Sequence, residues 1–526
     1  MPQPDIEIVD SALLYPAQRP KETTTPLSIL DGTVTHYAPC AAIWFFDAPA
    51  DKSAELNWSQ TLQKSLEKTL SAFPHLAGEL GIVKHIPEGD HTQRFGRLQI
   101  TYGAPTDPGV EFSTALSALT LDDVVPTAAQ RKTSEFNAWN LSCPVPTFFA
   151  DALKLPFIIP GPQKRAPPVL IRVTEFACGG ISIGVLIAHC LADAQTLSVF
   201  MHHWSREHAL LIANTKTSPS YSDIAHTKQE QQPLFNPQLL DTRAAGDIDA
   251  STPDESILAK SRSLPSTRYD WFYPLPDGDP DRYLPPGLTR KMIKSPGEPM
   301  PKGDWDHTLP KAHVKLHFSA AQIQDIWQKA GKGVSRHDAI LAHVWSAINR
   351  VRGLDGDERE VALHVIFGLR RRLGLPETFL GSPILSASVR MSGADACGRS
   401  SGSPSVASKI HSTLALYTED AAKARLHDLC FECAPQRFWE GYLGARHVIF
   451  SSWAHLDMYG VSFGREVPRH VEVCMPESDG MVSLIEGRPG SRAAGEKRKH
   501  WCDDGVDVGV TLAVDAIERL KADSAL

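Results

Sequence analysis

The sequence predicts a mixed α/β protein built from two α/β units that are joined by a long crossover. Segments with helical and with strand periodicity alternate up to about residue 211, and the same mixture returns after about residue 310. Between them the composition shifts to Pro, Asp, Gln, Ser and Lys. At roughly 150 residues per domain, the 526 residues suggest two to four compact units. We therefore expect one unit at 1–211, a crossover at 212–309 and a second unit at 310–526.

The first unit begins with an amphipathic helix and continues into a pair of strands. Residues 57–80 predict a surface helix whose apolar stripe consists of Leu62, Leu66 and Leu70. Residues 168–189 contain an alternating strand, a Gly-Gly turn and then an almost continuous apolar run. Helical spacing resumes after residue 193. His189 is thus expected at the end of a buried strand, and Asp193 at the start of a helix.

The crossover and the second unit are recognised by a change in residue types. Residues 274–287, PLPDGDPDRYLPPG, cannot carry regular structure because proline and glycine interrupt helices and strands. Beyond the crossover, residues 334–353 predict a helix with Ser335 as its N-cap, and a strand begins at Val361. The Gly/Ser-rich residues 392–405 are expected to form an exposed insertion. A strand and a helix follow one another in residues 506–523.

Charge and composition narrow the range of partners. The chain carries 53 Lys and Arg against 61 Asp and Glu, a formal charge of −8, and 42% of its residues are hydrophobic. This is the composition of a folded protein without the basic excess that nucleic-acid binding needs. The sequence shows neither a secretory signal nor the roughly 18 consecutive apolar residues of a membrane span. We expect no nucleic acid, no membrane span and a cytoplasmic location.

The nine cysteines do not predict a metal site. Cys430 and Cys433 have the spacing of half a zinc site, but no second pair at ligand spacing accompanies them. They lie one helical turn apart, which favours two buried core thiols. We expect reduced thiols, no metal and no tightly bound cofactor.

The most specific chemical signal is an HxxxD motif at the predicted strand-to-helix junction. Its histidine, His189, is a candidate general base, because an unperturbed imidazole titrates near neutrality, and the Asp193 carboxylate is close enough in sequence to hold local geometry. The structural alternative is a satisfied core histidine followed by a helix N-cap. Spacing alone favours that alternative, because the motif is short and the chain contains 21 histidines.

Two matches to GxSxG raise the alternative of a serine esterase. A nucleophile elbow places its serine between a strand and the helix that follows directly. Ser182 instead lies inside the predicted strand that leads to His189, and Ser400 lies in the Gly/Ser-rich segment. A serine esterase that uses Ser182 is therefore a remote alternative.

Several segments match one family pattern in the order in which that family has them. They are PLSILD at 26–31, LQKSLEKTLSAFPHLAGEL at 62–80, HCLAD at 189–193, SRHDAILAHVWSAINRVR at 335–352, FGLRRRLGLPETFLGSPIL at 367–385, SSWAHLDMYGVSFGREVP at 451–468 and SDGMVSLIEG at 478–487. Together they resemble the BAHD-type acyl-CoA-dependent acyltransferases, in particular the fungal branch that acylates secondary metabolites and includes the trichothecene acetyltransferases. The resemblance covers nearly the whole chain, which makes it far more specific than any single motif.

The resemblance implies a fold and roles for particular residues. The family fold consists of two similar domains like that of chloramphenicol acetyltransferase, with an active-site tunnel at their interface. His189 matches the general base that takes a proton from the acceptor as the acceptor attacks the acyl-CoA thioester. Asp193 matches a carboxylate that supports the site by pairing with an arginine of the second domain, and Arg370 is the candidate partner. Ser452 and Trp453 match positions near the acceptor tunnel.

The chain departs from the family pattern at several positions. Three motif positions differ: Ala194 replaces a glycine, Gly368 an aspartate and Ser382 an asparagine. The family's DFGWGKP loop is replaced by SFGREVP at 462–468. In the family this loop is remote from the catalytic histidine and supports the architecture. The resemblance therefore implies that Ser462, Phe463 and Gly464 affect stability or CoA affinity first.

The sequence thus predicts an acyl-CoA-dependent O-acyltransferase that transfers an acyl group, in the first instance acetyl, to a hydroxyl of a hydrophobic secondary metabolite. Acyl-CoA is expected as a cosubstrate, a small hydrophobic alcohol as the acceptor and a monomer as the oligomeric state. The altered SFGREVP loop motivates a second hypothesis, in which the fold is kept but acyl transfer is lost and the protein binds, cyclises or isomerises a metabolite. The two hypotheses differ in their dependence on CoA.

Overall fold

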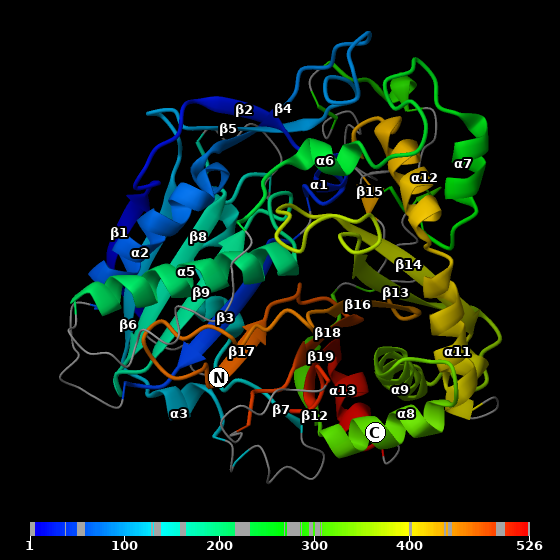
Figure 1. The fold of residues 1–526 in the computed structure, drawn as a ribbon. Coiled ribbons are helices and arrows are strands. Elements are labelled where there is room, and N and C mark those ends of the chain that lie inside the picture. The colour runs from blue at the N-terminus through cyan, green and yellow to red at the C-terminus, as the bar shows by residue number, and fades with distance from the viewer. Residues whose placement is uncertain are drawn as a thin grey trace.

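The computed structural model shows two large mixed β-sheets, each covered by helices (Figure 1). The structure describes residues 6–36, 38–49, 58–127, 130, 138–157, 165–215, 232–267, 269–270, 284–285, 287–293, 298–299, 306, 308–398, 402–435, 438–439, 444–490, 500–523 and 526. The predicted two-domain α/β class is confirmed.

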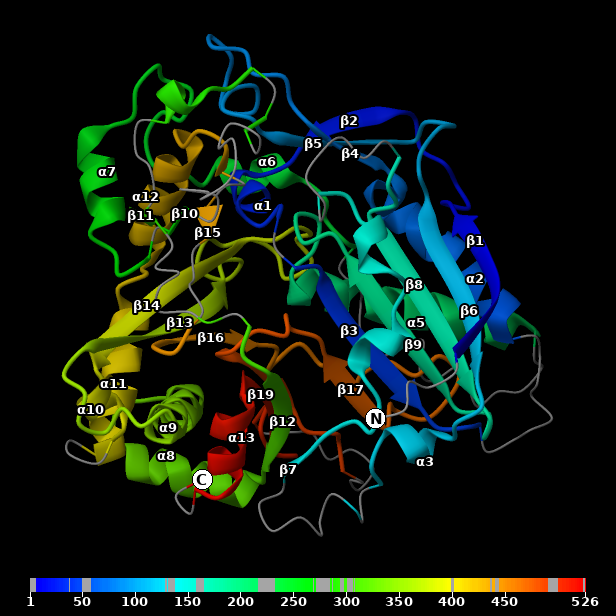
Figure 2. The ribbon, with the colours of Figure 1, turned by 180° about the vertical axis from the view of Figure 1, so that it is seen from behind.

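The first sheet is six-stranded, in the order β1-β6-β8-β9-β3-β17. Its strands are β1 (Ile6–Leu14), β3 (Cys40–Phe46), β6 (Val110–Ser117), β8 (Val169–Phe176), β9 (Ile181–Ile187) and β17 (His470–Val473). Helices α2 (Trp58–Ala72) and α5 (Ala194–Thr215) cover one face, which is turned toward the viewer in Figure 1 and away in Figure 2. The predicted stripe of α2 packs into this core, because Leu62, Leu66 and Leu70 are all buried there.

Strand β9 is buried along its whole length, as its continuous apolar sequence predicts. One face contacts the core under α2 and α5, and the other contacts a second cluster that includes Phe148 and Phe149. At Gly184 a Cβ atom would lie 2.3 Å from the backbone oxygen of Phe148, so only glycine permits this close approach. The strand therefore reaches the centre of the molecule as a rigid, covered element that ends two residues before His189.

The second sheet is seven-stranded, in the order β14-β13-β16-β18-β19-β12-β7. Its strands are β7 (Ala138–Trp139), β12 (Lys311–Phe318), β13 (Glu360–Gly368), β14 (Ile384–Ser392), β16 (His447–Ser452), β18 (Met481–Glu486) and β19 (Val506–Ala513). Its outer face is covered by helices α8 (Ala320–Ala330), α9 (Arg336–Val351), α11 (Gly402–Ala415) and α13 (Val514–Lys521). Helix α9 is the predicted one, and Ser335 is its N-cap.

The side chains of β16 alternate between the two faces of this sheet. Val448 and Phe450 pack against the outer helices, whereas Ile449 and Ser451 point to the opposite side and line a cavity. The period of two thus turns one face of the second sheet into a core and the other into a wall of the site.

Each large sheet receives one strand from the other half of the chain. Strand β17 pairs antiparallel with β3, and β7 pairs antiparallel with β12. The two sheets are therefore not formed by strictly separate halves of the sequence. The domain boundaries at 1–211, 212–309 and 310–526 stay a prediction.

The crossover contains more regular structure than its composition suggests. Helices α6 (Pro237–Asp241) and α7 (Glu255–Arg262) lie within it, together with the short strands β10 (Tyr269–Asp270) and β11 (Glu298–Pro299). Asp254 caps α7 by accepting hydrogen bonds from the backbone of Ser256 and Ile257. Regular structure was excluded only for residues 274–287, and these helices and strands lie outside that segment. Most of the PLPDGDPDRYLPPG segment lies outside the described residues.

The Gly/Ser-rich segment at 392–405 was also misjudged as an exposed insertion. Helix α10 (Gly393–Ala396) occupies its start, capped by the Ser392 hydroxyl, which accepts the backbone N–H of Asp395. Ala396 and Cys397 are buried in the core under the second sheet. The apolar residues on both sides draw this segment into the core. Ser400 lies outside the described residues.

The remaining elements surround the two layers. They are α1 (Ile29–Thr33), α3 (Leu121–Val124), α12 (Glu419–Cys430), β2 (Thr23–Pro26), β4 (Glu79–Ile82), β5 (Leu98–Tyr102), β15 (Phe438–Trp439) and the 3-10 turns Pro74–Ala77, Val145–Phe148, Ala152–Lys154 and Arg290–Met292. Cys430 and Cys433 are both buried, as predicted. Within the described ranges, none of the helices combines the length and the apolar character needed to cross a bilayer.

Candidate active site

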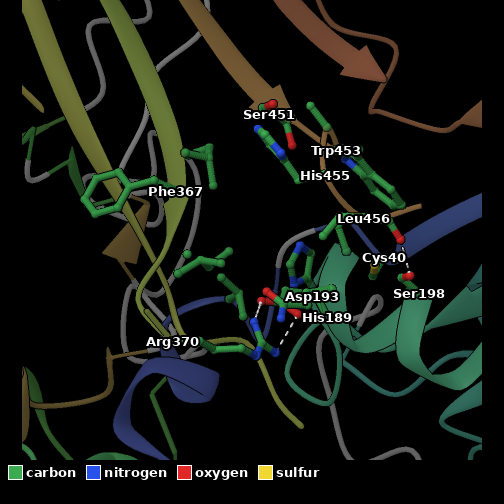
Figure 3. A pocket seen from close by; sticks show the side chains of 18 of the residues that line it. Cys40, His189, Asp193, Ser198, Phe367, Arg370, Ser451, Trp453, His455 and Leu456 are labelled. Carbon is green, nitrogen blue, oxygen red and sulfur yellow. Dashed lines mark hydrogen bonds and ion pairs between the residues drawn. The ribbon is translucent and has the colours of Figure 1, made fainter. Parts of the chain in front are cut away.

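A cavity of about 910 Å³ lies between the two sheets and is lined by both halves of the chain (Figure 3). The first half contributes Cys40, His189, Asp193 and Ser198, among others. The second half contributes residues of β13, β14 and β16 and of the segments that follow them, including Phe367, Arg370 and Trp453. A site of this size accommodates two small reactants, and most ligand cavities have volumes of about 300–1,000 Å³.

His189 follows the buried strand β9 and is half-buried in the cavity wall. Its Nδ1 lies 3.3 Å from the hydroxyl oxygen of Ser382, and that hydroxyl donates a hydrogen bond to the backbone oxygen of His189. Because the serine proton is committed to the carbonyl, Ser382 Oγ serves as an acceptor for an Nδ1–H of His189. The arrangement favours the tautomer in which Nε2 carries the lone pair.

The surroundings of His189 keep its imidazole neutral. Burial lowers the pKa of His189 below that of an ordinary histidine, although a hydrogen bond with its own backbone and the charge of Asp193 act in the opposite direction. A neutral imidazole is the form that can accept a proton.

Asp193 and Arg370 form a buried bidentate ion pair. Arg370 Nη1 lies 2.6 Å from Asp193 Oδ2, and Arg370 Nη2 lies 2.9 Å from Asp193 Oδ1. Asp193 Oδ1 also accepts the backbone N–H of Thr196 at 2.9 Å and so caps α5. The contact predicted between Asp193 and Arg370 is present, and the helix-cap interpretation of Asp193 is correct at the same time. The carboxylate joins the start of α5 to the segment after β13 (Figure 3).

The turn at Gly381 and Ser382 is hydrogen-bonded to both residues of this ion pair. The backbone oxygen of Gly381 accepts hydrogen bonds from the N–H of Asp193 at 3.1 Å, from the hydroxyl of Thr196 at 2.8 Å and from Arg370 Nη2 at 3.3 Å. In the sequence, Ser382 stands out only as a departure from the family pattern. In the structure Ser382 comes from the second half of the chain and contacts His189 directly.

Ser452 and Trp453 line the same cavity from the end of β16. Trp453 is buried, and its backbone N–H donates to the oxygen of Leu484 at 2.7 Å. The following segment is tied to α5, because the Ser198 hydroxyl donates to the oxygen of Leu456 at 2.6 Å. Helix α5, which begins after the HxxxD motif, is thus hydrogen-bonded to the segment that follows Trp453 in the cavity wall.

The altered loop at Ser462, Phe463 and Gly464 lies away from the cavity and is not among its lining residues. The backbone N–H groups of Ser462 and Phe463 approach the hydroxyl of Ser205 on α5, and Phe463 packs edge-on against Trp204. This loop therefore anchors α5 to the first sheet and contributes to the fold.

The alternative of a serine esterase finds no support among the described residues. Ser182 is fully buried within β9, and its hydroxyl has no hydrogen-bond partner, so no base activates it. Asp90, His91 and Asp249 are close enough together to hold a metal. Burial by itself would lower the pKa of His91, but hydrogen bonds with Asp241 and Asp249 raise it to about 9. These three residues do not line the cavity, so they take no part in the chemistry around His189.

Comparison with known proteins identifies the family. Residues 4–265 and 300–525 match the family described as "Transferase family". "Acyltransferase AFT15-1" of Alternaria alternata is 30% identical over 494 residues, covering 92% of this chain and 90% of the relative. "Acyltransferase abl6" of Leptosphaeria maculans is 28% identical over 530 residues, covering 99% and 98%. "Putrescine hydroxycinnamoyltransferase 1" of Oryza sativa is 25% identical and covers 98% of each chain.

Solved structures show the same fold. The structure of F. graminearum TRI101 with coenzyme A and deoxynivalenol superposes with a TM-score of 0.61 at 14% identity and covers 95% of this chain and 98% of that chain. Vinorine synthase superposes with a TM-score of 0.60 at 17% identity and covers 98% and 96%. The chain is an acyltransferase and belongs to the Transferase family, the BAHD-type acyltransferases.

Proposed function

We propose that this enzyme transfers an acyl group, in the first instance acetyl, from acyl-CoA to a hydroxyl group of a small hydrophobic metabolite, with His189 as the general base. The observation that carries the proposal is an imidazole that contacts the Ser382 hydroxyl in the wall of a cavity between two sheets, where burial lowers its pKa. The ligands of one structural neighbour support it, because TRI101 was solved in complex with coenzyme A and deoxynivalenol or T-2 mycotoxin.

In the proposed reaction, Nε2 of His189 takes the proton of the acceptor hydroxyl as the oxygen attacks the thioester carbon. The resulting tetrahedral intermediate breaks its carbon–sulfur bond and forms the ester. His189 then returns the proton to the departing CoA thiolate, so the imidazole is neutral again at the end of the cycle. No covalent intermediate on the protein is needed.

Asp193 supports this step through structure. Both of its oxygens are already bonded to Arg370 or to the backbone of Thr196, so it fixes the strand-to-helix junction instead of relaying a proton. The proposal assigns Arg370 the same supporting role, and it places the acceptor near Ser452 and Trp453.

The structure removes one argument for the second hypothesis, in which the fold is kept but acyl transfer is lost. That hypothesis rested on the altered SFGREVP loop, and the described contacts of the loop are with α5 and the first sheet. The loop does not line the cavity, so its change is not by itself an argument that acyl transfer has been lost.

We further propose a monomeric, cytoplasmic enzyme with acyl-CoA as a cosubstrate and no tightly bound cofactor. None of the nine cysteines forms a disulfide, which supports a reducing compartment. The proposed units are residues 1–211 and 310–526, connected by the crossover 212–309.

We expect thiol release from acetyl-CoA to depend on an alcohol acceptor in a panel of polyketide and polycyclic alcohols. Amines belong in the same panel because one family relative is named for putrescine. If CoA is released only with amines, the enzyme transfers the acyl group to nitrogen and not to oxygen. A metabolite converted without any CoA release would establish the second hypothesis instead.

A second prediction concerns the titration of His189. Because burial lowers its pKa, more than half of the His189 imidazole should be neutral at pH 6.5, the ordinary histidine value, and the titration midpoint should lie below that pH. Activity that depends on this base is then lost only as pH falls through the lowered pKa. NMR titration of the histidine Cε1 protons, assigned with His189→Ala, measures it. A midpoint at or above 6.5 would contradict the geometry.

A further inference from the structure

Asp31 is a buried carboxylate in α1 that lies against the Gly381–Ser382 turn. Its Oδ1 accepts the backbone N–H of Ser382 at 2.7 Å. Gly381 has a φ of +124°, and a Cβ atom at that position would lie 3.0 Å from the same oxygen. The carboxylate thus contacts the turn that presents Ser382 to His189.

The capping of α1 accounts for only one oxygen of Asp31. Oδ2 accepts the backbone N–H of Ser28 at 2.9 Å and the Ser28 hydroxyl at 2.6 Å, which is a capping box. Oδ1 takes no part in the capping box and is directed at Ser382 instead. The two oxygens therefore serve two different segments of the chain.

This placement has an electrostatic cost. Burial raises the pKa of Asp31 to about 7, even though the hydrogen bonds from Ser28 and Ser382 favour the ionised form. A helix cap does not require so deep a position, because the equivalent capping residue Asp123 of α3 is exposed. The contact of Oδ1 with the turn is the feature that distinguishes Asp31 from a simple cap.

The turn is held from both sides. On one side its Gly381 oxygen is bonded to the start of α5, through Asp193 and Thr196. On the other side α1 carries Asp31, and α1 is itself tied to the crossover, because Asp241 Oδ1 accepts the backbone N–H of Ile29 at 3.0 Å. Three segments that are distant in sequence thereby fix the Ser382 hydroxyl next to His189.

We propose that Asp31 is a positioning residue for His189, which acts by fixing the turn so that the Ser382 hydroxyl binds the imidazole and holds its proton on Nδ1. Asp31 does not touch the reactants. When kcat is measured, this inference rests on the proposed function. The environment of the His189 imidazole can also be measured by NMR, which needs no turnover.

The test uses Asp31→Asn, Ser382→Ala and the double variant. An amide in place of the carboxylate keeps one acceptor oxygen and loses the other, so the turn is loosened without removal of the side chain. We expect each single variant to lower kcat about tenfold and to change KM by less than about twofold, which corresponds to the loss of one well-placed hydrogen bond. Because Asp31 acts through Ser382, the double variant should be no slower than the slower single variant, within about twofold.

Asp338→Asn provides the matched control. Asp338 is the equivalent buried carboxylate in the capping box of α9, and it does not line the cavity. Its variant should lower the unfolding temperature and leave kcat unchanged. A merely structural role of Asp31 predicts the same behaviour for Asp31→Asn.

The NMR resonance of the His189 imidazole separates this proposal from the proposed function. It should shift in Asp31→Asn and in Ser382→Ala, but not in Asp338→Asn. If the wild-type protein transfers no acyl group, the proposed function fails, and a shifted resonance still supports the positioning. The positioning role of Asp31 would be overturned by an unchanged His189 resonance in folded Asp31→Asn. It would also be overturned if the two single-variant losses in kcat multiplied in the double variant. Ser382→Ala keeps the test decisive if Asp31→Asn does not fold.

Discussion

Replacing His189 with alanine is expected to lower kcat/KM for acyl transfer by about 10²–10⁴-fold, which is the usual contribution of a general base. Without the imidazole, the acceptor hydroxyl has to attack while still protonated, and water is a weak substitute. The measurement is the acceptor-dependent release of CoA by wild-type and variant protein at the same acceptor concentration.

The matched control for this variant is His317→Ala. His317 is a half-exposed histidine of β12 that pairs with Asp507 and does not line the cavity. It should keep the wild-type rate. Equal rates for His189→Ala and wild type, with both proteins folded, would remove His189 from the mechanism.

Replacing Arg370 with alanine is expected to destabilise the protein by about 3–5 kcal/mol, because it leaves a buried carboxylate without its partner. Asp193 is only 4% exposed, so water cannot replace the two guanidinium hydrogen bonds. The same change frees the Gly381–Ser382 turn, so activity should also fall. Denaturant unfolding measures the first effect and CoA release the second.

Two comparisons test this explanation. The double variant Arg370→Ala/Asp193→Asn removes the charge that Arg370→Ala leaves unpaired, so it should be more stable than Arg370→Ala alone. Arg359→Ala breaks an exposed ion pair with Asp357, and such pairs contribute at most about 1 kcal/mol. If Arg370→Ala were as stable as Arg359→Ala, the ion pair would have no structural importance.

The helices and strands around the site were predictable because their apolar residues recur with the period of a helix or run continuously as in a buried strand. The apolar run of β9 and the helical spacing of α5 placed His189 at a strand end and Asp193 at a helix start, and both placements are confirmed. The stripe of α2 and the cap at Ser335 were predictable for the same reason.

The exchange of strands between the two sheets was not predictable from pattern. Strand β7 has two residues and β17 has four, so neither is long enough to show a period. Their positions are set by tertiary partners: β17 lies on β3, and the buried Lys315 of β12 forms an ion pair with Glu472 of β17. Such pairings depend on the whole fold and leave no local signal.

The role of Ser382 and Asp31 was also beyond local sequence. The capping box of Ser28 and Asp31 accounts for a bond within α1 and says nothing about the second oxygen of Asp31. Only the long-range contact with Ser382, 351 residues away, shows what that oxygen binds.

The most direct test of the central claim is mass spectrometry after incubation of wild-type protein with [¹³C]acetyl-CoA and a responsive alcohol. Direct transfer predicts one labelled ester for each free CoA and an unchanged protein mass during turnover. With His189→Ala, both products should form about 10²–10⁴-fold more slowly. A labelled protein, or an acceptor that is altered without taking up the label, would contradict it.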